Sequence, residues 1–244
     1  MISKSDISLV RSLADKKART EHGLFVVEGP KLVGEALASG FAVKRVFGLP
    51  EFADLPGWEE ASRKDLERMS SLRTPQGVLA VVGIPRHKTE ADPSRGLVLA
   101  LDGIQDPGNL GTILRIADWF GIGDVVCSPD SADCFNPKVV QASMGAVLRV
   151  RVHYTGLPEF AAQTKCAVYG AFLDGENIYS ADFGPSPSGI IVMGNEGNGI
   201  SPEVAAKVTR KLYIPPYPAD SRSSESLNVA AATAVICSEF RRPR

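Results

Sequence analysis

The stretch "GIIVMGNEGNGIS", residues 189–201, passes from an apolar run into a turn rich in glycine. A short continuous apolar run is typical of a buried strand in a parallel sheet. Ser201 followed by Pro202 is a common start for a helix. The stretch therefore predicts a strand, a tight turn and a helix. Glycines in the turn would let another group approach its backbone closely.

That group is not expected to be a phosphate. The turn has neither the Gly-Lys-Ser/Thr ending of a P-loop nor the GxGxxG spacing of a dinucleotide site. Glu196 would also repel an anion, so a cationic or neutral polar ligand fits better. A tight turn followed by a capped helix, with no ligand at all, explains the glycines equally well.

The alternation of apolar strands and helices continues along the chain and indicates two α/β domains, with a parallel sheet covered on both faces. The segment "PRHKTEADPSRG", residues 85–96, has two prolines and no periodicity, and is expected to be a linker. Helices are expected at about 6–20, 30–39, 63–69, 108–120, 137–145, 157–164, from 202, and 226–240. Strands are expected at about 24–29, 43–48, 77–82, 96–103, 124–128, 148–154, 166–173, 189–194 and 211–216.

Composition is that of an ordinary globular protein: 244 residues, 44% hydrophobic and 23% charged, with a net charge of −1. Residues 1–88 carry a small excess of Lys and Arg, and the remainder a small excess of Asp and Glu. No apolar run is long enough to span a membrane and no secretory signal is visible, so a cytoplasmic location is expected. The four cysteines and three histidines are scattered, so neither a metal site nor a disulfide framework is expected.

A second informative segment is "DPGNLGTILRIADWFG", residues 106–121. Helical spacing places Leu110, Ile113, Leu114, Ala117 and Phe120 on one apolar stripe. Arg115 points away from that stripe, and taken alone it indicates a solvated outer face. Asn109 is suited to cap the first free amides of the helix.

A third segment is "LYIPPYPADSRSSESLNVAAATAVICSEF", residues 212–240. Its prolines cannot lie in a central strand, so the strand should end near Ile214. Ser226 is expected to cap the final helix. The alanines at the start of that helix allow close packing against another backbone.

These three segments, in this order, resemble the three motifs of the SpoU (TrmH-like) family of RNA ribose methyltransferases, of the SPOUT class. "NPKVVQASMGAVLRV" and "RSLADKKARTEHGLFVVEGPKLVGEAL" also resemble family segments. The resemblance implies a small L30e-like α/β domain (1–84) that holds RNA, the linker (85–96), and a parallel-sheet SPOUT domain (97–244) tied in a deep trefoil knot. It also implies a homodimer joined through the knotted domains.

The resemblance implies S-adenosylmethionine (AdoMet) as cofactor and methyl transfer to a ribose 2′-hydroxyl of ribosomal or transfer RNA, with no metal and no membrane. The implied cofactor-binding residues are Gly194, Asn195, Gly197, Gly199, Ile214, Pro215, Ser226 and Leu227. Arg115 is the main catalytic candidate, and the other residues implied to shape the catalytic site are Asn109, Glu196, Ser226 and Asn228. The candidate RNA contacts are Arg11, Lys16, Lys17, Arg19 and Arg115, although the first four also fit a merely solvated helix face.

Other functions stay open from the sequence. One is a SPOUT methyltransferase that acts on an RNA base, and another is a non-catalytic RNA-binding protein that keeps the knot as a scaffold. A nucleotide-phosphate enzyme is disfavoured by Glu196 and the missing lysine. The loop "PYPADSRSSE", residues 216–225, is longer than the resemblance leads us to expect, and we predict that residues 221–225 are mobile without ligand.

Overall fold

A computed structural model of the chain describes residues 2–85, 90–184, 187–218 and 226–243. Its contacts divide the chain into two compact units, Met1–Lys88 with Asp133–Arg149, and Thr89–Ala132 with Val150–Arg244. The loop residues 221–225, for which mobility is predicted, lie outside the described residues.

The second unit is built on a six-stranded sheet with the strand order β10-β8-β9-β5-β6-β7. All of its strand pairs are parallel, which confirms the parallel sheet predicted for this half of the chain. The strand order does not show whether the chain is knotted, so the trefoil knot stays a prediction. The elements are β5 (Leu97–Asp102), α5 (Pro107–Trp119), β6 (Asp124–Cys127), β7 (Arg151–Tyr154), α7 (Leu157–Gln163), β8 (Val168–Asn177), β9 (Gly189–Gly194), α8 (Pro202–Ala205), β10 (Arg210–Tyr213) and α9 (Val229–Arg241).

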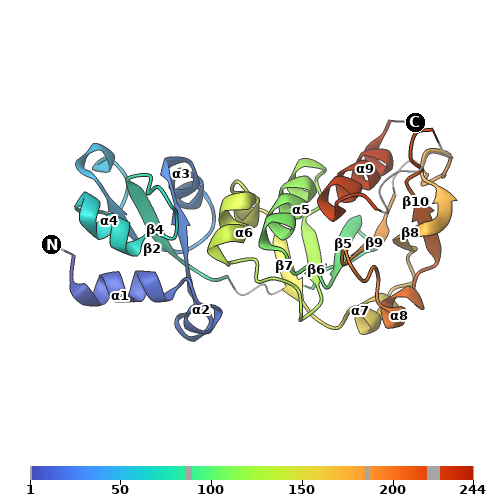
Figure 1. Cartoon of the computed structure of the whole chain (residues 1–244), viewed down its shortest axis with the longest axis horizontal. Coiled ribbons are helices and arrows are strands. Elements are labelled where there is room, and N and C mark those ends of the chain that lie inside the picture. Colours follow the sequence, from blue (N-terminus) through green and yellow to red (C-terminus); the bar gives the residue numbers. More distant parts are fainter. Residues whose placement is uncertain (1, 86–89, 185–186, 219–225, 244) are drawn as a thin grey trace. The chain divides into compact units, whose positions relative to one another are not determined.

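Helices cover both faces of this sheet (Figure 1), and its central strands β5 and β9 are accordingly apolar and buried on both sides. Successive strand residues point to opposite faces, so Val98 and Ile190 pack with Leu157 of α7 and Val204 of α8. Helices α5 and α9 pack against each other on the opposite face. The carboxyl ends of β5 and β9 are left at one edge, where their following loops emerge.

The first unit has a four-stranded sheet with the order β1-β4-β2-β3. It is mixed, because β4 is antiparallel to both β1 and β2 while β3 is parallel to β2. The sequence therefore predicts the α/β class of this unit but not its strand directions. Its elements are α1 (Lys4–Ser12), α2 (Lys16–His22), β1 (Leu24–Glu28), α3 (Pro30–Ala38), β2 (Val43–Gly48), η1 (Pro50–Phe52), β3 (Trp58–Glu60), α4 (Arg63–Met69), β4 (Val78–Gly83), α6 (Pro137–Ala142) and η2 (Ala146–Leu148).

The single helix expected over residues 6–20 is two helices. Asp15 caps the second helix, because its side chain accepts a hydrogen bond from the amide of Lys17 at 2.8 Å. The backbone at Asp15 is extended, and this breaks the helical path between α1 and α2.

Residues 133–149, which the sequence analysis assigns to the second domain, pack with the first unit. Phe135 lies against the buried Phe25, with ring centroids 4.5 Å apart. The Gln141 amide donates a hydrogen bond to the carbonyl of Glu28 at 3.0 Å. The segment is thus held to β1 by an aromatic contact and by a hydrogen bond.

Candidate functional site

The candidate site lies at the carboxyl edge of the parallel sheet in the second unit. Asp102 and Gly194, the last residues of the adjacent strands β5 and β9, are register partners. The Asp102 carboxylate accepts a hydrogen bond from the amide of Ser201 at 2.7 Å, beyond the glycine turn. Loops after neighbouring parallel strands meet at this edge, which is where such sheets bind ligands.

The glycine turn closes on itself. Asn195 and Gly199 exchange two backbone hydrogen bonds, of 3.0 and 2.9 Å. A Cβ atom added to Gly194 would lie 2.3 Å from the Gly199 carbonyl carbon, and Gly199 has a φ of +68°. Glycine is therefore required at both positions by the turn itself. At Gly197 a Cβ would only touch the Asn195 side chain at 3.4 Å, so the turn does not demand glycine there.

Asn195 fixes the turn to the neighbouring strand. Its Nδ2 donates to the carbonyl of Gly103, just after β5, at 2.8 Å. Its Oδ1 accepts from the amides of Gly197 and Asn198, at 2.8 and 3.1 Å. One side chain thus satisfies the amides inside the turn and joins two loops.

Asn109 connects the three sequence motifs. Its Nδ2 donates a hydrogen bond to the Glu196 carboxylate, and its Oδ1 accepts one from Asn228 Nδ2 at 3.0 Å. Asn109, Glu196 and Asn228 come from α5, the glycine turn and the start of α9. Three polar side chains are therefore joined by hydrogen bonds between segments that are far apart in the sequence.

Two helix caps differ from the expectation. Asp106 caps α5, because its carboxylate accepts a hydrogen bond from the backbone N–H of Asn109 at 2.8 Å. The side chain of Asn109 is therefore not used as a cap and bonds the other two motifs instead. Asn228, not Ser226, caps α9, with its Oδ1 accepting from the amides of Ala230 and Ala231. Ser201 does occupy the N-cap position of α8, followed by Pro202 as expected, but its side chain makes no capping hydrogen bond.

A pocket of about 420 Å³ opens beside these groups, which is a usual size for a small-molecule site. Seven of the eight predicted cofactor-binding residues line it, and Pro215 does not. The seven are Gly194, Asn195, Gly197, Gly199, Ile214, Ser226 and Leu227. Other lining residues were not predicted, among them Phe172 and Leu173 of β8, Met193 of β9 and Leu212 of β10. Met193 and Leu212 are next to the last residues of their strands, whereas Phe172 and Leu173 lie in the middle of β8, where the sequence gives no sign of a pocket.

The chemistry of this lining fits AdoMet. Met193, Leu212 and Ile214 give an apolar surface that suits an adenine ring, and the backbone of residues 194–199 supplies polar groups beside it. Glu196 also lines the pocket, and its negative charge favours a cationic group such as a sulfonium over a phosphate.

Arg115 is exposed on the outer face of α5, as its helical phase predicts. It is six residues beyond Asn109, which corresponds to about 9 Å along a helix axis. Arg115 is not among the residues that line the pocket, and no ion pair of its guanidinium is found among the described residues. Within one chain, Arg115 is therefore not brought together with Asn109, Glu196 and Asn228.

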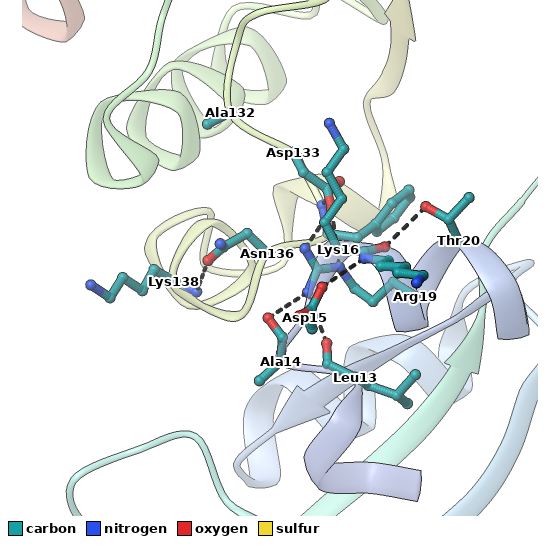
Figure 2. Close-up of polar contacts among 12 residues, drawn as sticks. Leu13, Ala14, Asp15, Lys16, Arg19, Thr20, Ala132, Asp133, Asn136 and Lys138 are labelled. Atoms are coloured by element: carbon teal, nitrogen blue, oxygen red, sulfur yellow. Dashed lines mark hydrogen bonds and ion pairs between the residues drawn. The ribbon is translucent and has the colours of Figure 1, made fainter.

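The predicted contact of Arg19 with RNA is wrong, because Arg19 is only 2% exposed. Its Nε and Nη2 donate to the Asp133 carboxylate at 3.0 and 2.6 Å. Its Nη1 donates to the carbonyls of Leu13 and Ala14, both at 2.8 Å (Figure 2). All of these hydrogen bonds of Arg19 are to residues of the first unit. Arg11, Lys16 and Lys17, by contrast, are exposed.

The described residues contain neither a cluster of metal-binding side chains nor a helix suited to span a membrane. Among the described residues, no three His, Cys, Asp or Glu side chains are placed to hold a metal ion together. None of the helices in the described parts of the chain is both long and apolar enough to cross a membrane.

The chain matches two family models. Residues 96–238 match the SpoU rRNA Methylase family, and residues 4–80 match the MRM3-like substrate binding domain. Relatives extend the likeness over nearly the whole chain. The 23S rRNA (guanosine(2553)-2′-O)-methyltransferase RlmP of Bacillus subtilis is 33% identical over 240 residues, covering 95% of this chain and 94% of the relative.

Solved structures of RNA methyltransferases are also similar to this chain over nearly its whole length. A TrmH-family protein of Porphyromonas gingivalis is 45% identical, with a TM-score of 0.88 over 99% of this chain and 98% of its own. An AdoMet-bound rRNA methyltransferase of Sinorhizobium meliloti is 26% identical, with a TM-score of 0.83 over 99% of this chain and 96% of its own. With the parallel sheet, the glycine turn and the three linked motifs, these matches show that the chain belongs to the SpoU rRNA methylase family.

Proposed function

We propose that this protein transfers a methyl group from AdoMet to a ribose 2′-hydroxyl of ribosomal RNA. The observation that carries the proposal is the hydrogen-bonded group of Asn109, Glu196 and Asn228 beside the pocket at the carboxyl edge of the sheet. The names of relatives support the substrate, because the Bacillus subtilis protein is a 23S rRNA 2′-O-methyltransferase. The AdoMet-bound Sinorhizobium meliloti structure supports the cofactor.

The residues proposed to hold AdoMet are those of the glycine turn and the two segments that follow it. When bound, AdoMet supplies a methyl group already activated by its sulfonium. The chain's own task is to keep the pocket shaped and to exclude water from it. The closed turn between Asn195 and Gly199 gives a rigid wall, and Ile214 and Leu227 give apolar surface. Pro215 and Ser226 belong to the same proposed set.

The polar group acts by orientation and charge. Asn109 holds the Glu196 carboxylate in one place and is itself held by Asn228. A fixed carboxylate at the pocket attracts a cationic centre, and preorganised groups of this kind cost little reorganisation during reaction. Ser226 lies in the same lining, and its hydroxyl can accept or donate to the ribose.

Arg115 is proposed to bind the phosphate next to the acceptor ribose and to stabilise the developing alkoxide. A guanidinium stays protonated under almost all conditions, so charge and a forked hydrogen-bond geometry are its natural contributions. Because Arg115 does not line the pocket of its own chain, this role needs another element to bring the two together.

A homodimer provides such an element. Trp119 is 84% exposed and, like Arg115, is on the outer face of α5. An exposed indole next to a catalytic candidate is typical of an interface residue. We propose that α5 packs against a second copy, so that Arg115 serves a site to which both subunits contribute.

The first unit is proposed to hold the RNA through exposed cations that include Arg11, Lys16 and Lys17. Its match to a substrate binding domain supports this division of labour. We also propose a cytoplasmic location, because the protein would encounter ribosomal RNA there.

The proposal is tested by incubating the protein and AdoMet with unmodified 23S rRNA and with unmodified transfer RNA, followed by nucleoside mass spectrometry. We expect one 2′-O-methylnucleoside in the ribosomal RNA. A methylated base would point instead to a base methyltransferase, and a modified transfer RNA alone would contradict the substrate.

A further inference from the structure

The first unit contains a second basic surface, separate from the cations of α1 and α2. It is a groove of about 270 Å³ between the start of α4 and the loop before β4. Two arginines, Arg63 and Arg73, line it together with Glu67 and Thr74, and the apolar side chains of Leu49 and Leu66 also line it. Both arginines are exposed.

These two guanidinium groups are not neutralised by an ion pair in the described parts of the chain, although the Glu67 carboxylate lines the same groove. Neither Arg63 nor Arg73 forms an ion pair with any of the described residues. Three other arginines of this unit are paired with carboxylates: Arg45 with Asp6 and Glu59, Arg19 with Asp133, and Arg149 with Glu35. Ion pairs within the fold therefore explain the presence of Arg19 and Arg45, but they do not explain the presence of Arg63 and Arg73.

The acidic residues nearby cancel only part of this charge, because Glu67 is the one carboxylate that lines the groove beside two arginines. The Asp65 carboxylate accepts a hydrogen bond from the Ser62 hydroxyl at 2.6 Å, and the backbone amide of Asp65 donates to the same hydroxyl oxygen at 3.1 Å, so Asp65 is committed to the start of α4. Glu67 lines the groove, but it follows Arg63 by four residues, which is the less favourable order for a helical ion pair. Arg63 is also the first residue of α4, where a cation opposes the helix dipole. The position is thus unfavourable for the helix and suggests a use outside it.

We propose that Arg63 and Arg73 bind two phosphates of the RNA backbone and thereby anchor the substrate on the first unit. The inference rests on the proposed function, which supplies RNA as the partner. Two guanidinium groups from separate elements flank a shallow groove, and each can bind a phosphate with two parallel hydrogen bonds. All residues of the groove fall within the segment, 4–80, that matches a substrate binding domain.

The chain offers a charge-matched control. Lys64 and Arg68 are also exposed, lie on the same helix and do not line the groove. The Arg63→Gln/Arg73→Gln and Lys64→Gln/Arg68→Gln double variants of the full chain therefore lose the same charge from the same region. Their affinities for an unmodified 23S rRNA transcript are measured by filter binding over a series of salt concentrations.

For the groove variant we expect about tenfold weaker binding at moderate salt. We also expect a salt slope smaller by roughly 1.4 to 1.8, which corresponds to two phosphate contacts. The control should change the slope by much less, and both variants should keep the parental melting temperature and AdoMet affinity. Equal losses in the two variants would show an effect of net charge alone and overturn the proposal, as would no loss in either or a parent that does not bind the transcript.

The two proposals fail in different ways. If the parent binds the transcript through the groove but forms no 2′-O-methylnucleoside, the proposed function fails and the groove stands. If the parent methylates the RNA and the groove variant does so with an unchanged KM for RNA, the groove fails and the function stands.

Discussion

Asn228 donates a hydrogen bond to Asn109 across 119 residues of sequence, with Nδ2 and Oδ1 3.0 Å apart. The same Asn109 donates to Glu196 of the glycine turn. Asn228 also caps α9, so the start of that helix, the start of α5 and the turn are set relative to one another by two side-chain amides and a carboxylate. The site depends on this connection.

Asn109→Ala should therefore lower kcat by roughly 10²-fold, the usual scale for losing one preorganised polar group. Glu196 and Asn228 would both lose their partner, while the apolar lining of the pocket is untouched. Single-turnover methylation of 23S rRNA measures the effect. Thr112→Ala, at an exposed position of the same helix, is the control and should methylate as the parent does. A parental rate for Asn109→Ala would remove Asn109 from the catalytic group.

Arg115→Ala should abolish most turnover, by about 10²- to 10³-fold, and should leave AdoMet affinity unchanged because Arg115 does not line the pocket. Arg115→Lys should recover only part of the rate, since lysine keeps the charge but not the forked geometry. Rate and affinity are measured on the same preparations. Loss of AdoMet binding in either variant would contradict the assignment.

Gly194→Ala should weaken AdoMet binding at least tenfold, because the added Cβ would collide with the backbone of Gly199 and force the turn open. Equilibrium dialysis with labelled AdoMet measures the affinity. Gly96→Ala is the matched control, because a Cβ there meets no atom within 4 Å and its φ is not left-handed. If both variants bind AdoMet equally well, the turn does not form the pocket wall.

Arg19→Ala should lower the free energy of unfolding by about 3 to 5 kcal/mol, the scale for leaving a buried ion partner uncompensated. Asp133 would lose its guanidinium, and the carbonyls of Leu13 and Ala14 would lose their donors. Urea unfolding measures the change, and the exposed Arg11→Ala should differ from the parent by less than about 0.5 kcal/mol. A similarly small effect at Arg19 would show that the pair is not a structural element.

Asp6 makes stability depend on acid. Its hydrogen bond from Arg45 lowers the pKa of the carboxyl from 3.8 to about 2. The ionised form is thus favoured in the folded protein, so this contribution is present above about pH 4 and is lost as the pH falls toward 2. Asp6→Asn should therefore show a smaller fall in unfolding free energy over that range than the parent. Asp54→Asn, at an exposed site, should follow the parental curve.

Patterns of neighbouring residues predicted the features that depend on neighbouring residues, such as strands and the exposed faces of helices. The apolar run of residues 189–194 is β9 as expected, and the helical phase of Arg115 placed it on the exposed face of α5. Cap positions were less certain, because Asp106 and Asn109, or Ser226 and Asn228, are equally good capping residues. Only the packing decides which residue of each pair caps its helix, and Asn228 both caps α9 and bonds Asn109.

Long-range partners could not be predicted. Nothing near Arg19 indicates burial, since its partner Asp133 follows 114 residues later. The packing of residues 133–149 with the first unit has the same cause, because a division drawn along the sequence cannot detect a segment that joins another unit and returns. The knot and the dimer stay predictions that rest on family resemblance and on the exposed face of α5.

One molecule of AdoMet is proposed to fill the pocket between the glycine turn and the segments around Ile214 and Leu227, with Asn109 of the first motif bonded to its wall. Titration calorimetry of the full chain with AdoMet, and with ATP as the phosphate-bearing comparison, tests this proposal most directly. We expect binding of one AdoMet per chain and no measurable heat with ATP, because Glu196 faces the pocket. No heat with AdoMet, or equal affinity for ATP, would contradict the account.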